Sequence, residues 1–126
     1  MAVDRRRATG RQGEDLAVSH LRDHGYKIIE RNYSCQIGEI DIVAKEAGTI
    51  VFVEVRSTTV ERFGSAIDSV NLRKQRKLSL LALRYLQEKN LLGQNCRFDV
   101  VGVHFSKENT QITLIQNAFE WREAQN

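Results

Sequence analysis

Two strand-like runs joined by a short loop, residues 38–57 (GEIDIVAKEAGTIVFVEVRS), constrain the fold of this chain more than any other stretch. Apolar residues alternate in the first run and are almost continuous in the second, and Ala47 and Gly48 lie between them. Such runs around a two-residue loop with glycine are typical of a β-hairpin. Asp41 and Glu54 interrupt the apolar runs, and a buried ionised carboxylate is costly unless it is paired or binds a metal ion. The stretch therefore predicts a hairpin with a polar site inside it.

The two-residue loop sets which residues of the hairpin face each other. Asp41 is expected directly opposite Glu54, with Cβ atoms roughly 4.5–5.5 Å apart, and Glu39 opposite Arg56 as an ordinary cross-strand ion pair. Two carboxylates so placed repel each other, so their pKa values shift or a cation joins them. A hard divalent ion such as Mg²⁺ satisfies both with oxygen ligands alone. We therefore expect Mg²⁺, or Mn²⁺ in its place, at this pair.

The pattern of apolar residues predicts a single α/β domain over residues 1–126. The expected elements are a helix at 11–24, strands at 26–34, 38–45 and 50–57, a helix at about 67–90, and strands at 96–105 and 111–119. This αβββαββ order indicates one mixed sheet with helices packed on it. The chain has no proline, internal repeat or low-complexity linker, so no domain boundary is expected, and residues 1–10 form a basic N-terminal arm.

The composition favours a soluble cytoplasmic protein. No run of about 18 apolar residues occurs that could span a membrane, and no apolar stretch follows the arginines of the first residues, as a signal peptide would require. Cys35 and Cys96 lie in strand-like runs without metal-ligand spacing, so both are expected to be small core side chains.

Charge is distributed unevenly along the chain. Residues 32–69 hold three basic and six acidic side chains, whereas residues 70–90 hold six basic and one acidic, and residues 4–11 hold four arginines and one aspartate. A polyanion that lies across basic flanks toward an acidic, cation-binding centre would fit this pattern. The pattern therefore favours a nucleic-acid partner, although charge runs on helices are commonly solvated faces.

Each expected helix directs one charged residue toward the sheet. Glu14 lies close to Ala17 and Leu21 on the apolar stripe of the first helix, and Lys74 lies within the stripe of the helix at 67–90. Taken alone, Glu14 could be a first-turn partner of the helix dipole, and Lys74 could extend its ammonium group to solvent. Together with the hairpin they predict three inward carboxylates and an inward lysine.

This set of side chains favours phosphodiester hydrolysis. Carboxylates can hold a metal ion that polarises a phosphoryl oxygen and lowers the pKa of an attacking water. A neighbouring cation stabilises the charge that grows in the transition state. Arg56 and Lys74 are the candidates for that cation, and Lys74 is the better candidate for a general base because arginine stays protonated.

The same residues resemble two known sequence patterns. Asp41, twelve residues, then Glu54, Val55 and Arg56 resemble the PD-(D/E)XK signature of restriction-endonuclease-like nucleases. A wider pattern is similar to the YraN-like family of uncharacterised bacterial proteins, which is considered distantly related to archaeal Holliday junction resolvases. That wider pattern consists of GEDLAVSHLRDHGYKIIERNY, GEIDIVA, VFVEVR, Phe63–Gly64, Lys74 and RFDVV at 97–101.

The resemblance implies a restriction-endonuclease-like αβββαβ core within about residues 11–105. It also implies a metal site whose ligands are Glu14, Asp41, Glu54 and the backbone carbonyl of Val55. Two positions depart from the nuclease signature: Ile40 replaces its proline, and Arg56 replaces its lysine. Resolvases act as two-fold dimers on branched DNA, so the resemblance also points to a homodimer, in which Leu80 and Leu83 could take part or could instead pack within their own chain.

Three functions follow as hypotheses. The leading one is a Mg²⁺-dependent endonuclease that hydrolyses DNA, with branched DNA among its candidate substrates. The second is a nucleic-acid-binding module that has kept the fold and lost hydrolysis, and the third is a structural adaptor whose carboxylates are held by ion pairs. The residues expected to contact DNA phosphates are Arg5, Arg6, Arg7, Arg73, Arg76 and Lys77.

Overall fold

The computed structural model describes residues 5–59 and 66–123 of the chain. The elements are α1 (Arg5–Asp23), β1 (Lys27–Cys35), β2 (Gly38–Glu46), β3 (Thr49–Thr58), the 3₁₀ helix η1 (Ala66–Ser69), α2 (Leu72–Glu88), β4 (Cys96–His104) and β5 (Gln111–Phe119). All five predicted strands are confirmed to within a residue or so at each end. Phe63 and Gly64 of the predicted pattern lie outside the described residues.

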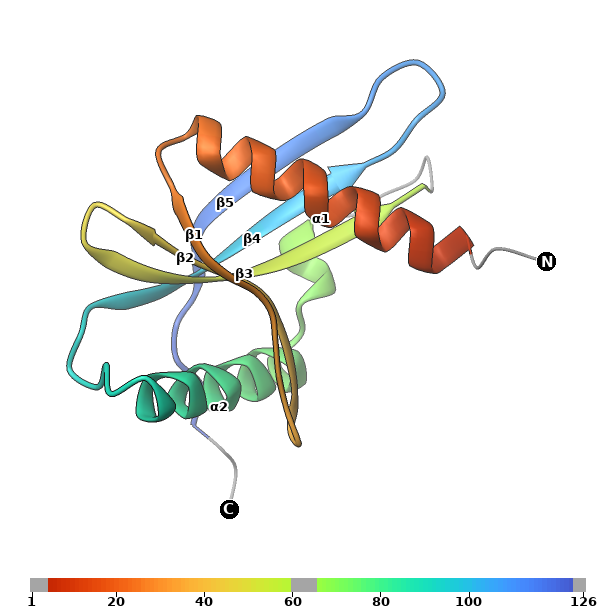
Figure 1. The fold of residues 1–126 in the computed structure, drawn as a ribbon. Coiled ribbons are helices and arrows are strands. Elements are labelled where there is room, and N and C mark those ends of the chain that lie inside the picture. Colours follow the sequence, from red (N-terminus) through yellow and green to blue (C-terminus); the bar gives the residue numbers. More distant parts are fainter. Residues whose placement is uncertain (1–4, 60–65, 124–126) are drawn as a thin grey trace.

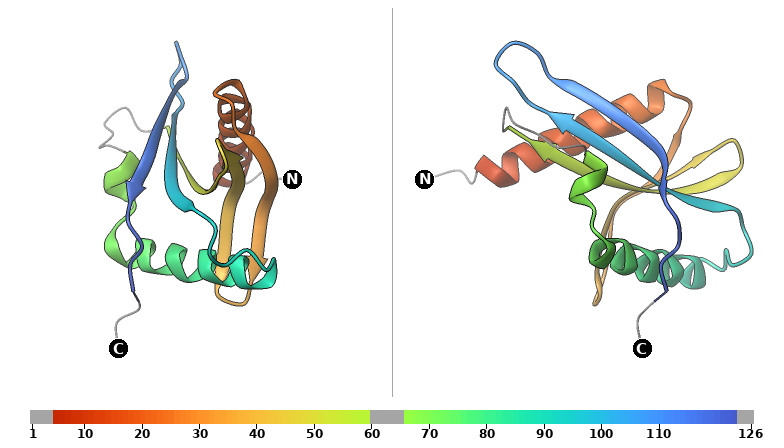
Figure 2. Two further views of the ribbon diagram at one scale, coloured as in Figure 1. Left: turned by 90° about the vertical axis from the view of Figure 1, so that its left-hand side faces the viewer. Right: turned by 180° about the vertical axis from the view of Figure 1, so that it is seen from behind.

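The five strands form one mixed sheet in the order β1-β2-β3-β4-β5. Neighbouring strands are antiparallel except β3 and β4, which are parallel and are connected through η1 and α2. A parallel pair needs such a crossover, because its strands cannot be joined by a tight turn. Helix α1 covers one face of the sheet and α2 the other (Figures 1 and 2). This arrangement confirms the α/β class and agrees with the predicted restriction-endonuclease-like core.

The sheet is buried on both faces, which explains the nearly continuous apolar runs of its central strands. Val43 and Phe52 pack in the cluster that includes α2 residues, whereas Ile42 and Val53 pack in the cluster that includes α1 residues. Ile40 belongs to the α2 cluster although it is two residues from Ile42. The strict alternation of strand side chains therefore breaks between them, at the position of Asp41.

The tight β2–β3 turn is confirmed. Cα pairing runs from Glu46 and Thr49 at the turn to Ile42 and Val53. Ala47 has a φ of 49° and Gly48 a φ of 82°, as the two central residues of a type I′ turn require. The register predicted from the two-residue loop is therefore correct for the half of the hairpin next to the turn.

The predicted boundaries of both helices are wrong at their N-terminal ends. Helix α1 begins at Arg5 rather than at residue 11, because the arginine-rich segment contains good helix formers and no proline. Helix α2 begins at Leu72, because the Asn71 side chain accepts a hydrogen bond from the Lys74 N–H at 2.9 Å and caps the helix there. Within residues 5–59 and 66–123, the helices are too short or too polar to cross a membrane.

Candidate active site

Asp41 and Glu54 come together where β2 and β3 separate. Regular pairing ends at Ile42 and Val53, and beyond it the Asp41 Oδ2 atom accepts the backbone N–H of Val55 at 2.8 Å. The sequence predicted the two carboxylates to be opposite each other in a regular ladder, and that geometry is wrong. A side chain replaces the backbone as acceptor, so the strands can part while the Val55 N–H stays bonded.

The two carboxylates interact directly. Burial raises the pKa of Asp41 to about 7, and the charge and hydrogen bonding of Glu54 act in the same direction. The Val55 N–H and the positive charge of Lys74 lower the pKa of Asp41, but by less. A pair of this kind holds a proton near neutral pH, or exchanges that proton for a metal ion.

Lys74 is the cation that reaches this pair. Its Nζ atom lies 3.5 Å from Glu54 Oε2, and Glu54 is only 6% exposed. The Asn71 cap fixes Lys74 in the first turn of α2, at the helix end nearest the carboxylates. The inward direction predicted for Lys74 is therefore confirmed, and its side chain remains 36% exposed at the rim of the site.

Arg56 is bound by Ser69, the last residue of η1. Its Nε atom donates to Ser69 Oγ at 2.9 Å, and its Nη2 atom donates to the Ser69 carbonyl oxygen at 3.4 Å. In the sheet Arg56 lies opposite Gly102, whereas Glu39 lies opposite Ser34. The predicted Glu39–Arg56 pair is therefore wrong, because β2 has left β3 before it reaches Glu39.

Glu14 approaches the site from α1 but is bound to a different cation. Arg31 Nε lies 3.3 Å from Glu14 Oε1. Burial raises the pKa of Glu14, and the negative charge of Asp41 raises it further, while the hydrogen bond from Arg31 lowers it. The close approach of α1 to β3 depends on Gly13, because a Cβ atom there would lie 1.9 Å from Ser57 Oγ. The inward direction predicted for Glu14 is confirmed.

These side chains fit a divalent metal ion in part. Asp41 and Glu54 supply adjacent carboxylate oxygens, which hard cations such as Mg²⁺ prefer. Across residues 5–59 and 66–123, however, no three His, Cys, Asp or Glu side chains are already arranged to hold a metal. Glu14, the third predicted carboxylate ligand, is instead in contact with Arg31.

The α2 residues predicted to contact DNA divide into two groups. Lys77 and Arg73 lie within about 100° of Lys74 around the helix axis, whereas Arg76 lies about 160° away. The end of the Lys77 side chain packs against Gly38 at the start of β2. Arg73 and Lys77 therefore lie nearer to the Lys74 face of α2 than Arg76 does.

The remaining surface predictions concern both helices. Arg5, Arg6 and Arg7 form the first residues of α1 rather than part of an irregular arm. On α2, Leu80 and Leu83 are 44% and 38% exposed, so each is covered by its own chain over more than half of its surface and still presents an apolar patch to solvent. Their place in a homodimer stays a prediction.

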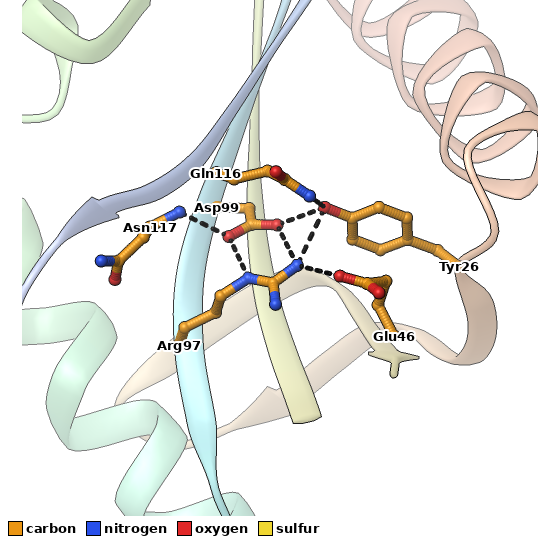
Figure 3. A network of polar contacts seen from close by, with 6 residues as sticks. All are labelled: Tyr26, Glu46, Arg97, Asp99, Gln116 and Asn117. Atoms are coloured by element: carbon orange, nitrogen blue, oxygen red, sulfur yellow. Dashed lines mark hydrogen bonds and ion pairs between the residues drawn. The ribbon is translucent and has the colours of Figure 1, made fainter. Parts of the chain in front are cut away.

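Sequence reasoning missed a second polar cluster, centred on Asp99 (Figure 3). Asp99 is fully buried, and it accepts hydrogen bonds from the Tyr26 hydroxyl at 2.7 Å, the Asn117 N–H at 2.9 Å and Arg97 Nε at 3.0 Å. It lies where the β4–β5 register shifts, between Phe98 and Val100. Its charge is paired and fully hydrogen-bonded, which marks a structural role. The one signal in the sequence was a charged residue within the apolar run at 97–101.

Arg97 extends this cluster to β2. Its Nη2 atom donates to Glu46 Oε1 at 3.0 Å and to the Tyr26 hydroxyl at 3.1 Å, and Gln116 Nε2 donates to the same hydroxyl at 2.8 Å. The cluster thus joins β2, β4 and β5 to the segment that follows α1 (Figure 3). Asp99 lies opposite Val53, the residue before Glu54, but the cluster contributes no group to the candidate site.

Comparison with known proteins gives sequence relatives over most of the chain. The family described as "Uncharacterised protein family UPF0102" matches residues 13–103. A UPF0102 protein of Syntrophus aciditrophicus is 46% identical over 89% of this chain and 88% of its own length. One from Desulforamulus reducens is 47% identical over 90% of this chain and 96% of its own.

Solved structures are similar only at a low level. The structure of Pyrococcus furiosus SfsA in complex with Ca²⁺ has a TM-score of 0.41 and 17% identity, and the match covers 91% of this chain and 65% of that one. The crystal structure of SSO0001 has a TM-score of 0.40 and 11% identity, with 93% and 55% covered. At these scores the likeness supports no inference about the site.

Proposed function

Because the chain belongs to UPF0102, an uncharacterised family, we propose a function from its site: a divalent-metal-dependent endonuclease that hydrolyses phosphodiester bonds in DNA. The membership also confirms the resemblance to the YraN-like family. The observation that supports the proposal most is the Asp41–Glu54 pair, two interacting carboxylates at a strand separation with Lys74 beside them. Burying such a pair is costly, and carboxylates with perturbed pKa values gather at functional sites.

Asp41 and Glu54 would hold the metal, which we take to be Mg²⁺ or Mn²⁺. The further ligands would be Glu14 and the backbone carbonyl of Val55, the residue whose N–H already binds Asp41. A bound ion would polarise a phosphoryl oxygen and acidify an attacking water. The Val55 N–H fixes one oxygen of Asp41, which leaves the other for the ion and keeps the carboxylate oriented.

Lys74 would supply the cation that stabilises charge on the phosphoryl group. Its ammonium group lies 3.5 Å from Glu54 Oε2 and the side chain is 36% exposed, so it can contact a phosphate that arrives beside the pair. Arg56 occupies the signature position of this cation, yet its guanidinium group is already bound by Ser69. We therefore assign the leading catalytic role to Lys74 and a secondary one to Arg56.

Basic residues next to the site support a nucleic-acid substrate. Arg73 and Lys77 flank Lys74 on α2, and their charges would attract phosphates to the carboxylate site. The preference for branched DNA depends on the family resemblance alone. Branched DNA is therefore one of the three substrates to be tested.

The test is cleavage of a labelled four-way junction, a linear duplex and a single strand, each with Mg²⁺, Mn²⁺ or a chelator. Wild type is compared with Glu54→Gln, which removes the charge but keeps the shape. Glu39→Gln is the matched control, because Glu39 is an exposed acid of the same hairpin that lies opposite Ser34. Metal-dependent cleavage lost in Glu54→Gln and kept in Glu39→Gln is expected. Cleavage unaffected by Glu54→Gln would overturn the assignment.

A second function, a nucleic-acid-binding module without hydrolysis, has one observation in its favour. Arg56 is bound to Ser69 and Glu14 to Arg31, so two of the predicted site residues already have partners. This function predicts binding to the same three DNA forms with no cleavage in any metal. The structural adaptor predicts neither binding nor a calorimetric response to Mg²⁺ or Mn²⁺.

A further inference from the structure

Arg31 is a residue of the site that sequence reasoning did not single out. It lies on β1 opposite Ile42, the residue that follows Asp41 on β2. Its guanidinium group contacts two acids of α1, Glu14 and Asp15. Its Nε atom lies 3.3 Å from Glu14 Oε1, and its Nη2 atom lies 2.6 Å from Asp15 Oδ1. Arg31 therefore contacts Glu14, a predicted ligand of the site, and Asp15, which lies outside the site.

The two acids that Arg31 contacts differ in their exposure to solvent. The Glu14 side chain is 14% exposed and that of Asp15 is 68% exposed, with Arg31 between them at 38%. A largely buried carboxylate gains more from a cation than an exposed one, because water screens it less. Glu14 therefore needs a positive partner, and in the metal-free protein Arg31 is that partner.

Glu14 is also the acid that a metal site of three carboxylates would need in addition to Asp41 and Glu54. It interacts electrostatically with Asp41, which in turn interacts with Glu54. Yet no three-acid metal group is assembled in the part of the chain that the structure describes. Glu14 is the further acid of the predicted set, and Arg31 contacts its Oε1 atom.

From this geometry we infer that Arg31 competes with a divalent metal ion for Glu14, so that metal binding must displace the guanidinium group. The inference rests on the proposed function, since it assumes that Asp41 and Glu54 bind the metal. After a metal ion displaces Arg31 from Glu14, Arg31 can keep its shorter contact, the one with Asp15. The site thus binds metal more weakly in the free protein than its three carboxylates alone would allow.

The competition is expected to be modest. A partly exposed ion pair contributes at most about 1 kcal/mol, which corresponds to about a fivefold change in affinity. Arg31→Gln should therefore tighten binding of Mn²⁺ about two- to fivefold in the absence of nucleic acid. The effect should depend on Glu14, so Arg31→Gln should change nothing when Glu14→Gln is also present.

The test is a titration of the full chain with Mn²⁺, followed by the electron paramagnetic resonance signal of the free ion. The variants are wild type, Arg31→Gln, Glu14→Gln and the double variant. Arg22→Gln is the control for net charge, because Arg22 is exposed on α1 about 12 Å along the helix from Glu14. Thermal unfolding of each variant establishes that it is folded.

Tighter binding in Arg31→Gln alone, with Arg22→Gln close to wild type, supports the inference. Binding in Arg31→Gln that equals or falls below that of Arg22→Gln overturns it and leaves the proposed function intact. An equal gain in the Glu14→Gln background also overturns it, since the effect would then be general charge. No Mn²⁺ binding by the wild type overturns the proposed function, and the inference with it.

Discussion

At the scale of single residues, the sequence predicted which side chains matter better than it predicted how they are held. Apolar neighbours on both sides marked Asp41 and Glu54 as unusual, and their interaction is present in the structure. The contact between Asp41 and the Val55 N–H could not be predicted, because it depends on where the strand pairing stops. The Arg31–Glu14 contact was missed because it joins β1 to α1, which have no fixed register relative to each other.

The raised pKa of Asp41 predicts how stability depends on pH. Its pKa is about 7 in the folded metal-free protein and 3.8 in the absence of the fold, so folding favours the protonated form. The contribution of Asp41 to the free energy of unfolding is complete below about pH 4 and is lost as the pH rises through 7. Asp41→Asn, which cannot ionise, should therefore be more stable than wild type at pH 8, by up to about 4 kcal/mol.

Urea unfolding at pH 5 and pH 8 without metal measures this effect. The advantage of Asp41→Asn should be largest at pH 8 and smaller at pH 5, and Glu39→Gln should show no such trend. An Asp41→Asn variant that is less stable than wild type at both values would contradict the assignment of a strained, ionised Asp41.

The different positions of Lys74 and Arg56 predict different kinetic effects. Lys74→Gln should lower kcat for DNA cleavage by about 10²-fold, since it removes the cation next to Glu54. Arg56→Gln should have a smaller effect, because its guanidinium group is bound to Ser69 rather than to the carboxylate pair. Lys77→Gln is the control one turn along α2 and should weaken DNA binding with little change in kcat. Equal loss of kcat in Lys74→Gln and Lys77→Gln would contradict the assignment of the catalytic cation to Lys74.

At the scale of elements, strand positions were predictable and helix starts were not. Period-two patterning and glycine-containing turns located all five strands. The start of α2 is decided by the Asn71 cap, one residue among several polar candidates. Helix α1 starts at Arg5, within the segment that was predicted to be a basic N-terminal arm.

The packing of α1 on β3 leads to a prediction about Gly13. Gly13→Ala would place a Cβ atom 1.9 Å from Ser57 Oγ and 3.1 Å from Ser57 Cβ, so the helix must move away. We expect a loss of about 1–3 kcal/mol in the free energy of unfolding, as for other overpacked contacts, together with weaker metal binding through Glu14. Gly10→Ala is the control, since a Cβ atom there would meet open space.

A double-mutant cycle identifies the cause. In a Ser57→Gly background the atoms that would clash are gone, so Gly13→Ala should cost much less there than in wild type. The same cost in both backgrounds would mean that the clash with Ser57 is not what requires glycine at this position.

At the scale of the whole molecule, the α/β class followed from the order of elements, whereas the polar cluster at Asp99 did not. Two neighbouring parallel strands need a crossover connection, and β3 and β4, which are joined through α2, are such a pair. The Asp99 cluster joins residues as far apart in the sequence as Tyr26 and Gln116, so no local pattern indicates it. Its polar contacts are separate from those of the carboxylate pair, although Asp99 lies opposite Val53, the residue before Glu54.

Separating these two polar sites gives a prediction for Tyr26. Tyr26→Phe removes a hydroxyl that donates to Asp99 and accepts from Arg97 and Gln116. The loss of a buried hydrogen-bond partner should cost about 1–3 kcal/mol of stability. Mn²⁺ affinity and DNA cleavage below the unfolding transition should stay at the wild-type level. A loss of metal affinity without a loss of stability would mean that the two clusters are coupled.

The central claim, that the Asp41–Glu54 pair exchanges a proton for a divalent metal ion, is tested most directly by calorimetric titration with Mg²⁺ at pH 6. The heat is measured in two buffers of different ionisation enthalpy, because the difference reports the protons released on binding. For wild type we predict binding with release of close to one proton per metal, since Asp41 is protonated at pH 6. Asp41→Asn should bind more weakly and release none. Absence of binding, or binding by wild type with the same heat in both buffers, would contradict the account.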